Sequence, residues 1–387
     1  MPKKDALLVD VEPSVLEWAI NSAGWNRGEL VKRLKVGSTT FDGWIKKEQK
    51  PSVRQLEALA KIVKRPLAVF FLPNPPQEKP LPKDYRMMPG KEGRFEKKTL
   101  LAIRRARRLQ KLSKELAENL NAAMEIRASQ AKIGDDPKKL AQHYAKEFGF
   151  TEEVRNKFRN PNEFFNFLRE AIEDRNALVF QSSMPIEDAR GFCLADESPV
   201  VVVVNSKDAI EARIFTLAHE LGHLLLRESE IGLQENSLFT KNLDAVEKWC
   251  NDFASALLLP EETAKNEFAL NKQALTESPT LKKLSRKLKI SKAMLLYNMH
   301  QLGFISQSQY SAVLDRYKPI EEGVKTAKKK GGFAQSSDKR CLTEKGQKFV
   351  SLVANNVEKG FITHSEALDY LSIKSKNLDK VMGRAKK

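Results

Sequence analysis

The sequence predicts an α+β fold that is predominantly helical and contains one small mixed sheet. Much of the chain of 387 residues has apolar positions at the spacing of amphipathic helices. Three short apolar runs, at 177–180, 191–195 and 199–204, are typical of strands and lie close together in the sequence. A proline-rich segment at 73–93 is typical of an extended, semi-rigid linker, so we expect separate domains on either side of it.

Composition limits the class of protein. A hydrophobic content of 41% is enough for two or three domains with real cores. No apolar run reaches membrane length and the N-terminus lacks the apolar core of a secretion signal, so we expect a cytoplasmic protein without a membrane partner. The three cysteines are odd in number and outside any Cys-x-x-Cys pattern, which disfavours a disulfide framework. The net charge of +17 favours a polyanionic partner, most simply nucleic acid.

Residues 10–72 are predicted to form a five-helix bundle that contains a helix-turn-helix. Asn26 is expected to cap the first helix of this pair, and Ser38 to cap the second at 39–46. If the second helix enters a major groove, its N-terminal side chains could reach base edges and the lysines after it could reach phosphate. The base-edge candidates are Ser38, Thr39, Thr40 and Asp42, and the phosphate candidates are Lys46, Lys47 and Lys50.

Two stretches, L-K-V-G-S-T-T-F-D-G-W at 34–44 and K-P-S-V-R-Q-L-E-A-L-A at 50–60, resemble the Xre-type (Cro and lambda-repressor-like) helix-turn-helix domain. The resemblance implies double-stranded DNA as a partner. Residues 45–49 depart from the usual pattern, because they read I-K-K-E-Q where a Glu-x-Gly normally follows the tryptophan. The alternative is a docking or dimerisation module, since hydroxyls and an aspartate are weaker base-reading groups than arginine or glutamine.

A long helix is predicted from Phe95 to about Glu125, followed by helices at 137–148 and 161–174. The first carries an arginine cluster that we interpret as a solvated face rather than a nucleic-acid contact; its members are Arg104, Arg105, Arg107 and Arg108. The three strands follow, and a helix at 210–226 comes directly after the last. Its candidate caps are Asn205, Ser206 and Asp208.

That helix carries the motif A-H-E-L-G-H-L-L at 218–225. His219 and His223 are two of only five histidines, and their i, i+4 spacing puts both imidazoles on one helix face. Both can therefore reach one metal ion about 2 Å away. Glu220 would point beside the metal, where it can take a proton from a metal-bound water as general base. The pattern is typical of a zinc peptidase; the alternative is a surface helix that merely carries two histidines.

A catalytic zinc needs a third protein ligand, and the helix predicted at 246–259 offers one. Glu247 is the best candidate, and Asn251, one turn later, is placed to hydrogen-bond a ligand histidine. The competing ligands are Glu228, Glu230 and Cys250. Glu247 could instead be an ordinary surface glutamate, and Cys250 a small buried hydrophobe.

The stretches R-I-F-T-L-A-H-E-L-G-H-L-L-L at 213–226 and E-K-W-C-N-D-F-A-S-A-L-L-L-P at 247–260 resemble the ImmA/IrrE family of metallopeptidases, which often follow an Xre-type domain. The resemblance implies a gluzincin-like domain over 94–320, with Zn²⁺ held by His219, His223 and Glu247 and with Glu220 as the base. It also implies an endopeptidase that cleaves a repressor, an antitoxin-like protein or another regulator, in phage, mobile-element or stress-response derepression. The alternative function is a helix-turn-helix transcription regulator whose metal site is structural or sensory, without proteolysis.

The C-terminal part is predicted to be helical. The pattern of residues 278–305 again predicts two helices joined by a turn. We interpret this segment as a helical appendix packed on the peptidase core rather than as a second DNA-binding element. A flexible basic joint is expected at 328–332, followed by a small helical region at 333–387 to which the sequence assigns no chemistry. No motif assigns an oxyanion-stabilising role to the remaining histidines, which are His143, His300 and His364.

Overall fold

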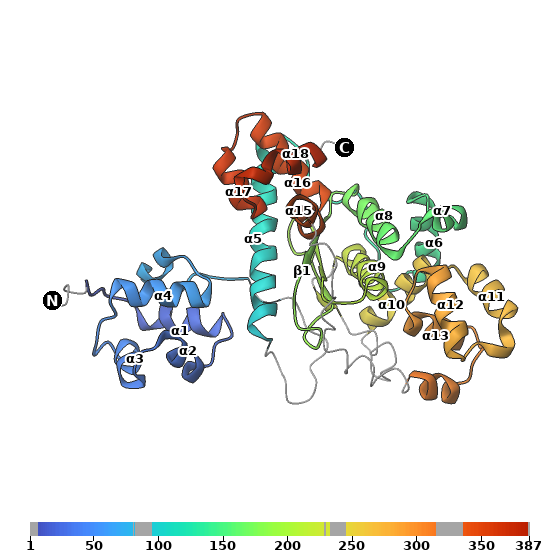
Figure 1. The fold of residues 1–387 in the computed structure, drawn as a ribbon, viewed down its shortest axis with the longest axis horizontal. Helices are drawn as coiled ribbons and strands as arrows, with labels where there is room; N and C mark the ends of the chain where they lie inside the picture. Colours follow the sequence, from blue (N-terminus) through green and yellow to red (C-terminus); the bar gives the residue numbers. More distant parts are fainter. Residues whose placement is uncertain are drawn as a thin grey trace. The chain divides into compact units, whose positions relative to one another are not determined.

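The computed structural model describes residues 7–79, 81, 95–227, 230–232, 245–314 and 336–385. The described residues up to Arg105 form one compact unit and those from Ala106 onward form a second (Figure 1). Helix α5 (Lys97–Asn119) contains the boundary between the two. The predicted basic joint at 328–332, and all of the predicted linker except residues 73–79 and 81, lie outside the described residues.

The first unit is a small helical bundle. Its elements are α1 (Pro13–Asn21), α2 (Arg27–Leu34), α3 (Ser38–Ile45), α4 (Val53–Val63) and the 3-10 helix η1 (Leu67–Phe71). The predicted fifth helix is therefore a single 3-10 segment. Leu16, Leu30, Phe41 and Trp44 are buried in one apolar core with side chains from α4 and η1.

Two of the bundle's helices begin where capping chemistry predicts, and one does not. Asn26 caps α2 as predicted, because its side chain accepts a hydrogen bond of 2.8 Å from the backbone N–H of Gly28. Ser52 and Gln55 form a capping box at the start of α4. The prediction for Ser38 was wrong, because Gly37 takes the extended conformation of the N-cap and Ser38 is already the first helical residue of α3.

The second unit contains the predicted mixed sheet, in the order β1-β3-β2-β4. Its strands are β1 (Leu178–Ser182), β2 (Gly191–Leu194), β3 (Val201–Asn205) and β4 (Glu230–Gly232). β1 pairs with β3 in parallel, whereas β2 pairs antiparallel with both β3 and β4. Every residue of β2 and β3 is buried, so helices and neighbouring strands cover both faces of the sheet at its centre.

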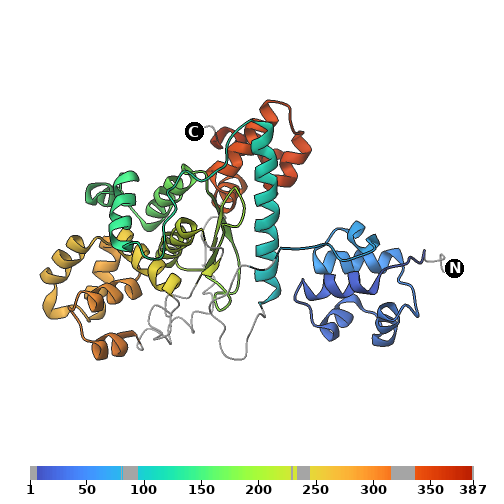
Figure 2. The same cartoon turned by 180° about the vertical axis from the view of Figure 1, so that it is seen from behind.

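Helix α9 (Ile210–Leu226) lies at the centre of the second unit and packs against α8, α10, β2 and β3 (Figures 1 and 2). The helices around it are α6 (Pro137–Glu147), α7 (Glu152–Lys157), α8 (Pro161–Glu173), α10 (Ala245–Leu258), α11 (Glu261–Leu270), η3 (Lys272–Ala274), α12 (Ser278–Leu288) and α13 (Lys292–Gln301). Residues 307–314 are also helical. Leu281, Leu284 and Leu295 belong to the same apolar core as Leu221, so α12 and α13 pack on the core as predicted.

The end of α5 and the N-cap of α9 differ from the sequence expectations. α5 ends at Asn119 rather than near Glu125, because the chain turns at Asn121, whose φ is 50°. None of the three candidate caps of α9 caps it: Ala209 occupies the N-cap position, and Asn205 is buried with its amide bound to backbone carbonyls at 184 and 189.

The arginine cluster on α5 is only partly a solvated face. Arg105 and Arg108 are exposed, but Arg107 forms an ion pair with Asp196. Arg104 is half-buried and donates a hydrogen bond of 3.1 Å to the carbonyl of Val63 within the first unit. Two of the four guanidinium groups therefore stabilise the fold instead of facing solvent.

The C-terminal helices α15 (Ser337–Lys345), α16 (Gln347–Glu358), α17 (His364–Leu371), η4 (Ser375–Asn377) and α18 (Leu378–Ala385) form a small bundle. Buried Arg169 of α8 attaches it to β1, because this guanidinium donates a hydrogen bond to the carbonyl of Val179 on β1 and also to the carbonyls of Leu342 (3.2 Å) and Thr343 (2.9 Å) on α15. Arg169 also pairs with buried Glu173 at 3.1 Å. These carbonyls end α15, where the helix dipole favours a cation. None of the described helices is long and apolar enough to cross a membrane.

We expect Arg169→Leu to destabilise the protein by about 3–5 kcal/mol, because it leaves the Glu173 carboxylate buried without its cation and frees the end of α15. Urea unfolding followed by circular dichroism measures the loss. The matched control is Arg108→Leu on exposed α5 surface, which we expect to change stability by less than about 0.5 kcal/mol. Equal stability of the two variants would show that the buried pair does not hold this junction.

Candidate metal centre

Three potential metal ligands meet between α9 and α10. The Nε2 atoms of His219 and His223 lie 3.1 Å apart. The carboxylate of Glu247 lies 3.2 Å from Nε2 of His223 and 3.7 Å from Nε2 of His219. All three side chains are at most 3% exposed. Among the residues that the structure describes, no other group of three or more histidine, cysteine or acidic side chains has the geometry to hold a metal.

These separations fit a tetrahedral metal ion. Zinc binds imidazole nitrogen and carboxylate oxygen at about 2.0–2.2 Å, so two ligands of a tetrahedral ion lie about 3.3–3.5 Å apart. The three separations scatter closely around that value. Three protein ligands leave one position of a tetrahedron for a water or a substrate, which is the arrangement of a catalytic rather than a structural zinc site.

The electrostatics of the cluster also suit a cation. Burial by itself raises the pKa of Glu247, but the two histidines outweigh burial and hold that pKa below its ordinary value. Glu247 therefore stays ionised at neutral pH. A divalent cation bound here would displace the protons of the two imidazoles and replace them as the positive partner of the buried carboxylate.

Helix packing brings the two halves of the cluster together. Gly222, on the α9 turn between the histidines, faces Cys250 of α10, and a Cβ at Gly222 would lie 3.0 Å from the Cys250 Sγ. The missing side chain therefore lets α9 and α10 approach closely enough for Glu247 to reach the histidines. Cys250, a rival ligand in the sequence reading, lies at this helix contact and is not part of the ligand cluster. Glu228 and the side chain of Glu230 lie outside the described residues.

Glu220 is completely buried, and β2 fixes its surroundings. A Cβ built on Gly191, the first residue of β2, would lie 3.1 Å from Oε1 of Glu220, 2.5 Å from Cγ2 of Thr216 and 2.9 Å from the carbonyl oxygen of Val203. Only a glycine fits between the sheet and this face of α9. Gly191 lies in a predicted strand, but its role does not follow from the sequence, because no local pattern shows which strand touches which helix.

Asn251, which the sequence predicts to hydrogen-bond a ligand histidine, lies on α10 one turn after Glu247. Its side chain is 3% exposed, and its Nδ2 has no hydrogen-bond partner among the described residues.

The thiol of Cys193 is buried. Its burial, and to a smaller extent the Glu220 carboxylate, raise the pKa of this thiol well above the ordinary value. Cys193 is therefore a protonated, unreactive core side chain at neutral pH.

The three histidines without an assigned role lie outside the ligand cluster. His300 stacks on Tyr310 with ring centroids 5.4 Å apart, and His143 lies 3.4 Å from the carboxylate of Glu147 on the surface of α6. His364 opens α17 in the C-terminal bundle. The sequence left the oxyanion-stabilising residue open, and the described geometry adds no histidine to the site.

The candidate DNA-contacting residues lie on α3 and the turn after it. Ser38, Thr39, Lys46, Lys47 and Lys50 are exposed, and Thr40 and Asp42 are half-exposed. Three of the charged candidates have partners within the bundle: Asp42 pairs with Arg27, Lys47 with Glu12 at 2.9 Å, and Lys50 with Asp10 at 2.7 Å. Exposed pairs of this kind contribute little stability, so they do not prevent the lysines from meeting a phosphate.

Residues 172–300 match the protein family described as Peptidase_M78, the IrrE N-terminal-like domain. The matched segment is about a third of the chain, runs from the end of α8 into α13, and contains all three ligands and Glu220. No curated protein matches the chain. The match supports the ImmA/IrrE family and a metallopeptidase-like function for this segment.

We expect the protein to bind a single zinc ion, and Glu247→Gln to weaken binding by more than about 100-fold, since even groups that only orient a ligand contribute about 10–100-fold. Titration calorimetry on chelator-treated protein measures both affinities. Glu262→Gln on exposed α11 is the matched control, and Cys250→Ala should also bind zinc as the wild type does. Zinc affinity that falls in the Cys250 variant but not in the Glu247 variant would reverse the ligand assignment.

A second expectation concerns Gly191→Ala. The added methyl group would overlap Thr216 and the β3 backbone, and overpacking of this kind costs about 1–3 kcal/mol. Chemical denaturation measures the loss. Gly134→Ala is the control, because a Cβ there meets no atom within 4 Å and the backbone conformation is not left-handed. Gly191→Ala with wild-type stability would show that the β2–α9 contact is not tight.

Proposed function

We propose that the chain is a zinc-dependent endopeptidase that cleaves a repressor, an antitoxin-like protein or another regulator, and that its N-terminal bundle binds double-stranded DNA. One observation carries the peptidase part of this proposal: three buried candidate ligands lie within reach of one metal ion, and a second buried carboxylate, that of Glu220, follows His219 on the same helix. This is the residue set for activating a water molecule and attacking a peptide carbonyl.

His219, His223 and Glu247 would hold the zinc ion. When bound, the ion would supply Lewis acidity, which makes water more acidic and polarises a carbonyl group. Glu220 would take the proton from the attacking water and pass it to the leaving amine, as general base and then general acid. Its carboxylate is buried on the side of Gly191, and a proton transfer from the water would require hydrogen-bond distance between the two.

The edge of the sheet at β4 offers a place where an extended peptide substrate could bind. β4 is an edge of the described sheet and pairs with β2, the strand whose first residue touches Glu220. An extended peptide that adds to this edge would be held by main-chain hydrogen bonds, with its peptide groups near the ligand cluster. Recognition through the main chain requires an unfolded or exposed segment of the substrate, so we expect cleavage in a linker or loop of the target.

The DNA part of the proposal rests on charge and on the helix-turn-helix pattern. The net charge of the chain is +17, and Ser38, Thr39 and Lys46 are exposed on or just after α3. A bundle of this kind would bring the peptidase to regulators that sit on DNA. The alternative is a transcription regulator whose metal site is structural or sensory, and it predicts DNA binding without cleavage.

Glu220→Gln is expected to keep zinc binding and stability but to lower cleavage at least about 100-fold, because the amide cannot accept the proton. The assay incubates the zinc-loaded chain with the regulatory proteins encoded by the genes adjacent to its own, and mass spectrometry identifies any cleavage products. Cleavage by the variant at the wild-type rate would contradict the role of Glu220. Absence of cleavage by the zinc-loaded wild type, with DNA binding intact, would favour the regulator.

Replacing Lys46 with glutamine is expected to weaken duplex binding equally for all sequences and to lower the salt slope by about 1. Replacing Thr39 with alanine should instead change the preference between sequences. Fluorescence anisotropy at several salt concentrations measures both. Duplex binding that survives deletion of residues 1–72 would place the DNA contact elsewhere in the chain.

A further inference from the structure

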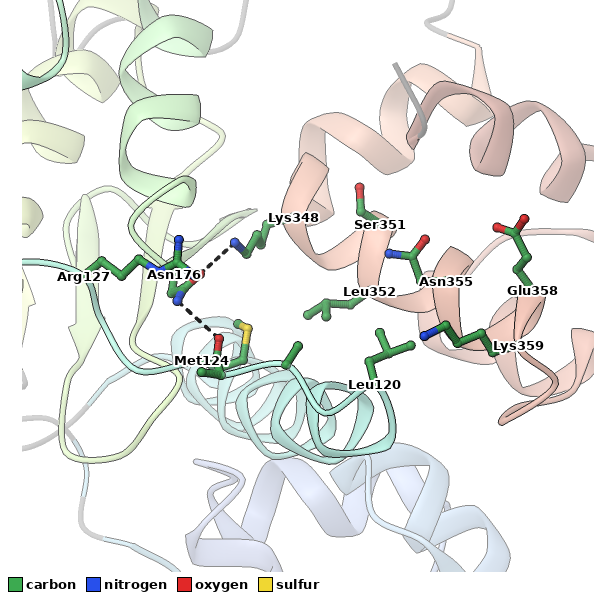
Figure 3. A pocket seen from close by; sticks show the side chains of 12 residues that line it. Leu120, Met124, Arg127, Asn176, Lys348, Ser351, Leu352, Asn355, Glu358 and Lys359 are labelled. Carbon is green, nitrogen blue, oxygen red and sulfur yellow. Dashed lines mark hydrogen bonds between the residues drawn. The ribbon is translucent and has the colours of Figure 1, made fainter.

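A pocket with a volume of about 730 Å³ lies in the second unit, and none of its lining residues belongs to the metal cluster. Its walls come from segments far apart in the chain: residues 120–127, which follow α5, and one face of α16 (Figure 3). Asn176, just before β1, closes one end. Pockets of about 300–1,000 Å³ are typical of small-molecule sites in proteins.

The pocket has an apolar floor and a basic end. Leu120, Met124 and Leu352 contribute the apolar surface. Figure 3 shows Arg127 and Lys348 together at the end closed by Asn176. Lys359 adds a third cation from the opposite end, so the lining contains three cations and a single carboxylate, that of Glu358.

Two of the pocket's cations, Arg127 and Lys359, are exposed, and Lys348 is half-buried. Among the described residues, no carboxylate forms an ion pair with Arg127, Lys348 or Lys359, although ion pairs are common elsewhere in the unit. The Nζ of Lys348 donates a hydrogen bond of 2.9 Å to Oδ1 of Asn176, which is a neutral acceptor. An ammonium group has three N–H donors, so Lys348 can still donate to a ligand.

The position of Asn176 is set by the protein and does not depend on a ligand. Its side chain is 3% exposed, and its Nδ2 donates to the carbonyls of Ala123 (3.2 Å) and Glu125 (3.0 Å). Its Oδ1 must therefore face Lys348. Burial, with a smaller contribution from Arg127, lowers the pKa of Lys348 despite the opposing effect of Asp174. An anion beside the ammonium group would offset this cost of holding its charge.

We propose that this pocket binds a small organic anion, with its carboxylate or phosphate at Lys348 and Arg127 and its apolar body on Leu120, Met124 and Leu352. A nucleic-acid strand fits less well, because the lining contains no aromatic side chain on which a base could stack. The proposal is independent of the peptidase function, since it involves no residue of the metal cluster.

Binding would also strengthen the attachment of the C-terminal bundle. The same wall already carries a contact between these segments, because Asn356 of α16 donates a hydrogen bond of 2.9 Å to the carbonyl of Leu116 and accepts one of 3.0 Å from Asn119. A ligand that touches residues 120–127 and α16 together binds only the folded, assembled state, and it therefore raises the free energy of unfolding by mass action.

The test titrates the full chain with hexyl phosphate and with hexanoate, and uses inorganic phosphate and hexanol as probes that lack one half of the ligand. We expect at least one of the alkyl anions to bind once per chain with a Kd of about 1 mM or tighter. Because it binds the folded state, it should also raise Tm. The comparison of the two alkyl anions shows which head group the basic end prefers.

Arg127→Gln and Lys348→Gln should each weaken binding about 10-fold or more, because each removes a charged hydrogen-bond donor. Arg127→Gln breaks no ion pair, so it tests the site even if Lys348→Gln disturbs Asn176. The matched control is Lys380→Gln on α18, which removes an exposed cation of the same bundle outside the pocket and should bind as the wild type does.

The proposal would be overturned by the absence of saturable binding to the folded wild type. It would equally fail if both pocket variants bound the alkyl anions as tightly as the wild type, or if inorganic phosphate or hexanol alone bound as tightly as the alkyl anions.

Discussion

The close approach of α9 and α10 at Gly222 and Cys250 is the contact on which the rest of the site depends. The two histidines of α9 are fixed relative to each other by helix geometry, but Glu247 reaches them only because α10 packs without an intervening side chain at position 222. Two buried histidines alone would be unremarkable polar groups. With a buried carboxylate 3.2 Å away they form a ligand set whose desolvation a cation would offset.

The same unit uses burial of charge in three different ways. Glu247 is held ionised by the histidines beside it, while Arg169 and Glu173 neutralise each other and fasten the C-terminal bundle to β1. In the pocket beside α16 only Lys348 is partly buried, and its hydrogen-bond acceptor is the neutral side chain of Asn176, whereas Arg127 and Lys359 are exposed. The first arrangement suits a metal ion, the second is structural, and the third leaves charge for a ligand to satisfy.

Features of the fold and of the site that depend on residues close together in the sequence could be predicted, whereas those that depend on contacts between distant elements could not. The α9 motif, the mixed sheet and the Asn26 cap were predicted because spacing and capping act over a few residues. The position of Glu247 beside the two histidines was expected because a zinc site requires a third ligand, and α10 is the next helix after α9 in the described chain. Gly191 and the attachment of α15 by Arg169 were missed, since they depend on contacts between elements whose neighbours no local pattern reveals. The predictions that Ser38 caps α3 and that Asn205, Ser206 or Asp208 caps α9 were wrong. Ser38 lies one residue after the N-cap position of α3, and Asp208 lies one residue before that of α9.

X-ray absorption of the zinc-loaded protein tests the central claim most directly, because it distinguishes ligand elements by distance. The account predicts only nitrogen and oxygen ligands, at about 2.0–2.2 Å, with two imidazole signatures from His219 and His223. A sulfur ligand at about 2.3 Å would contradict it, since that distance would identify Cys250 or Cys193 as a ligand and would require α9 and α10 to pack differently from the arrangement described.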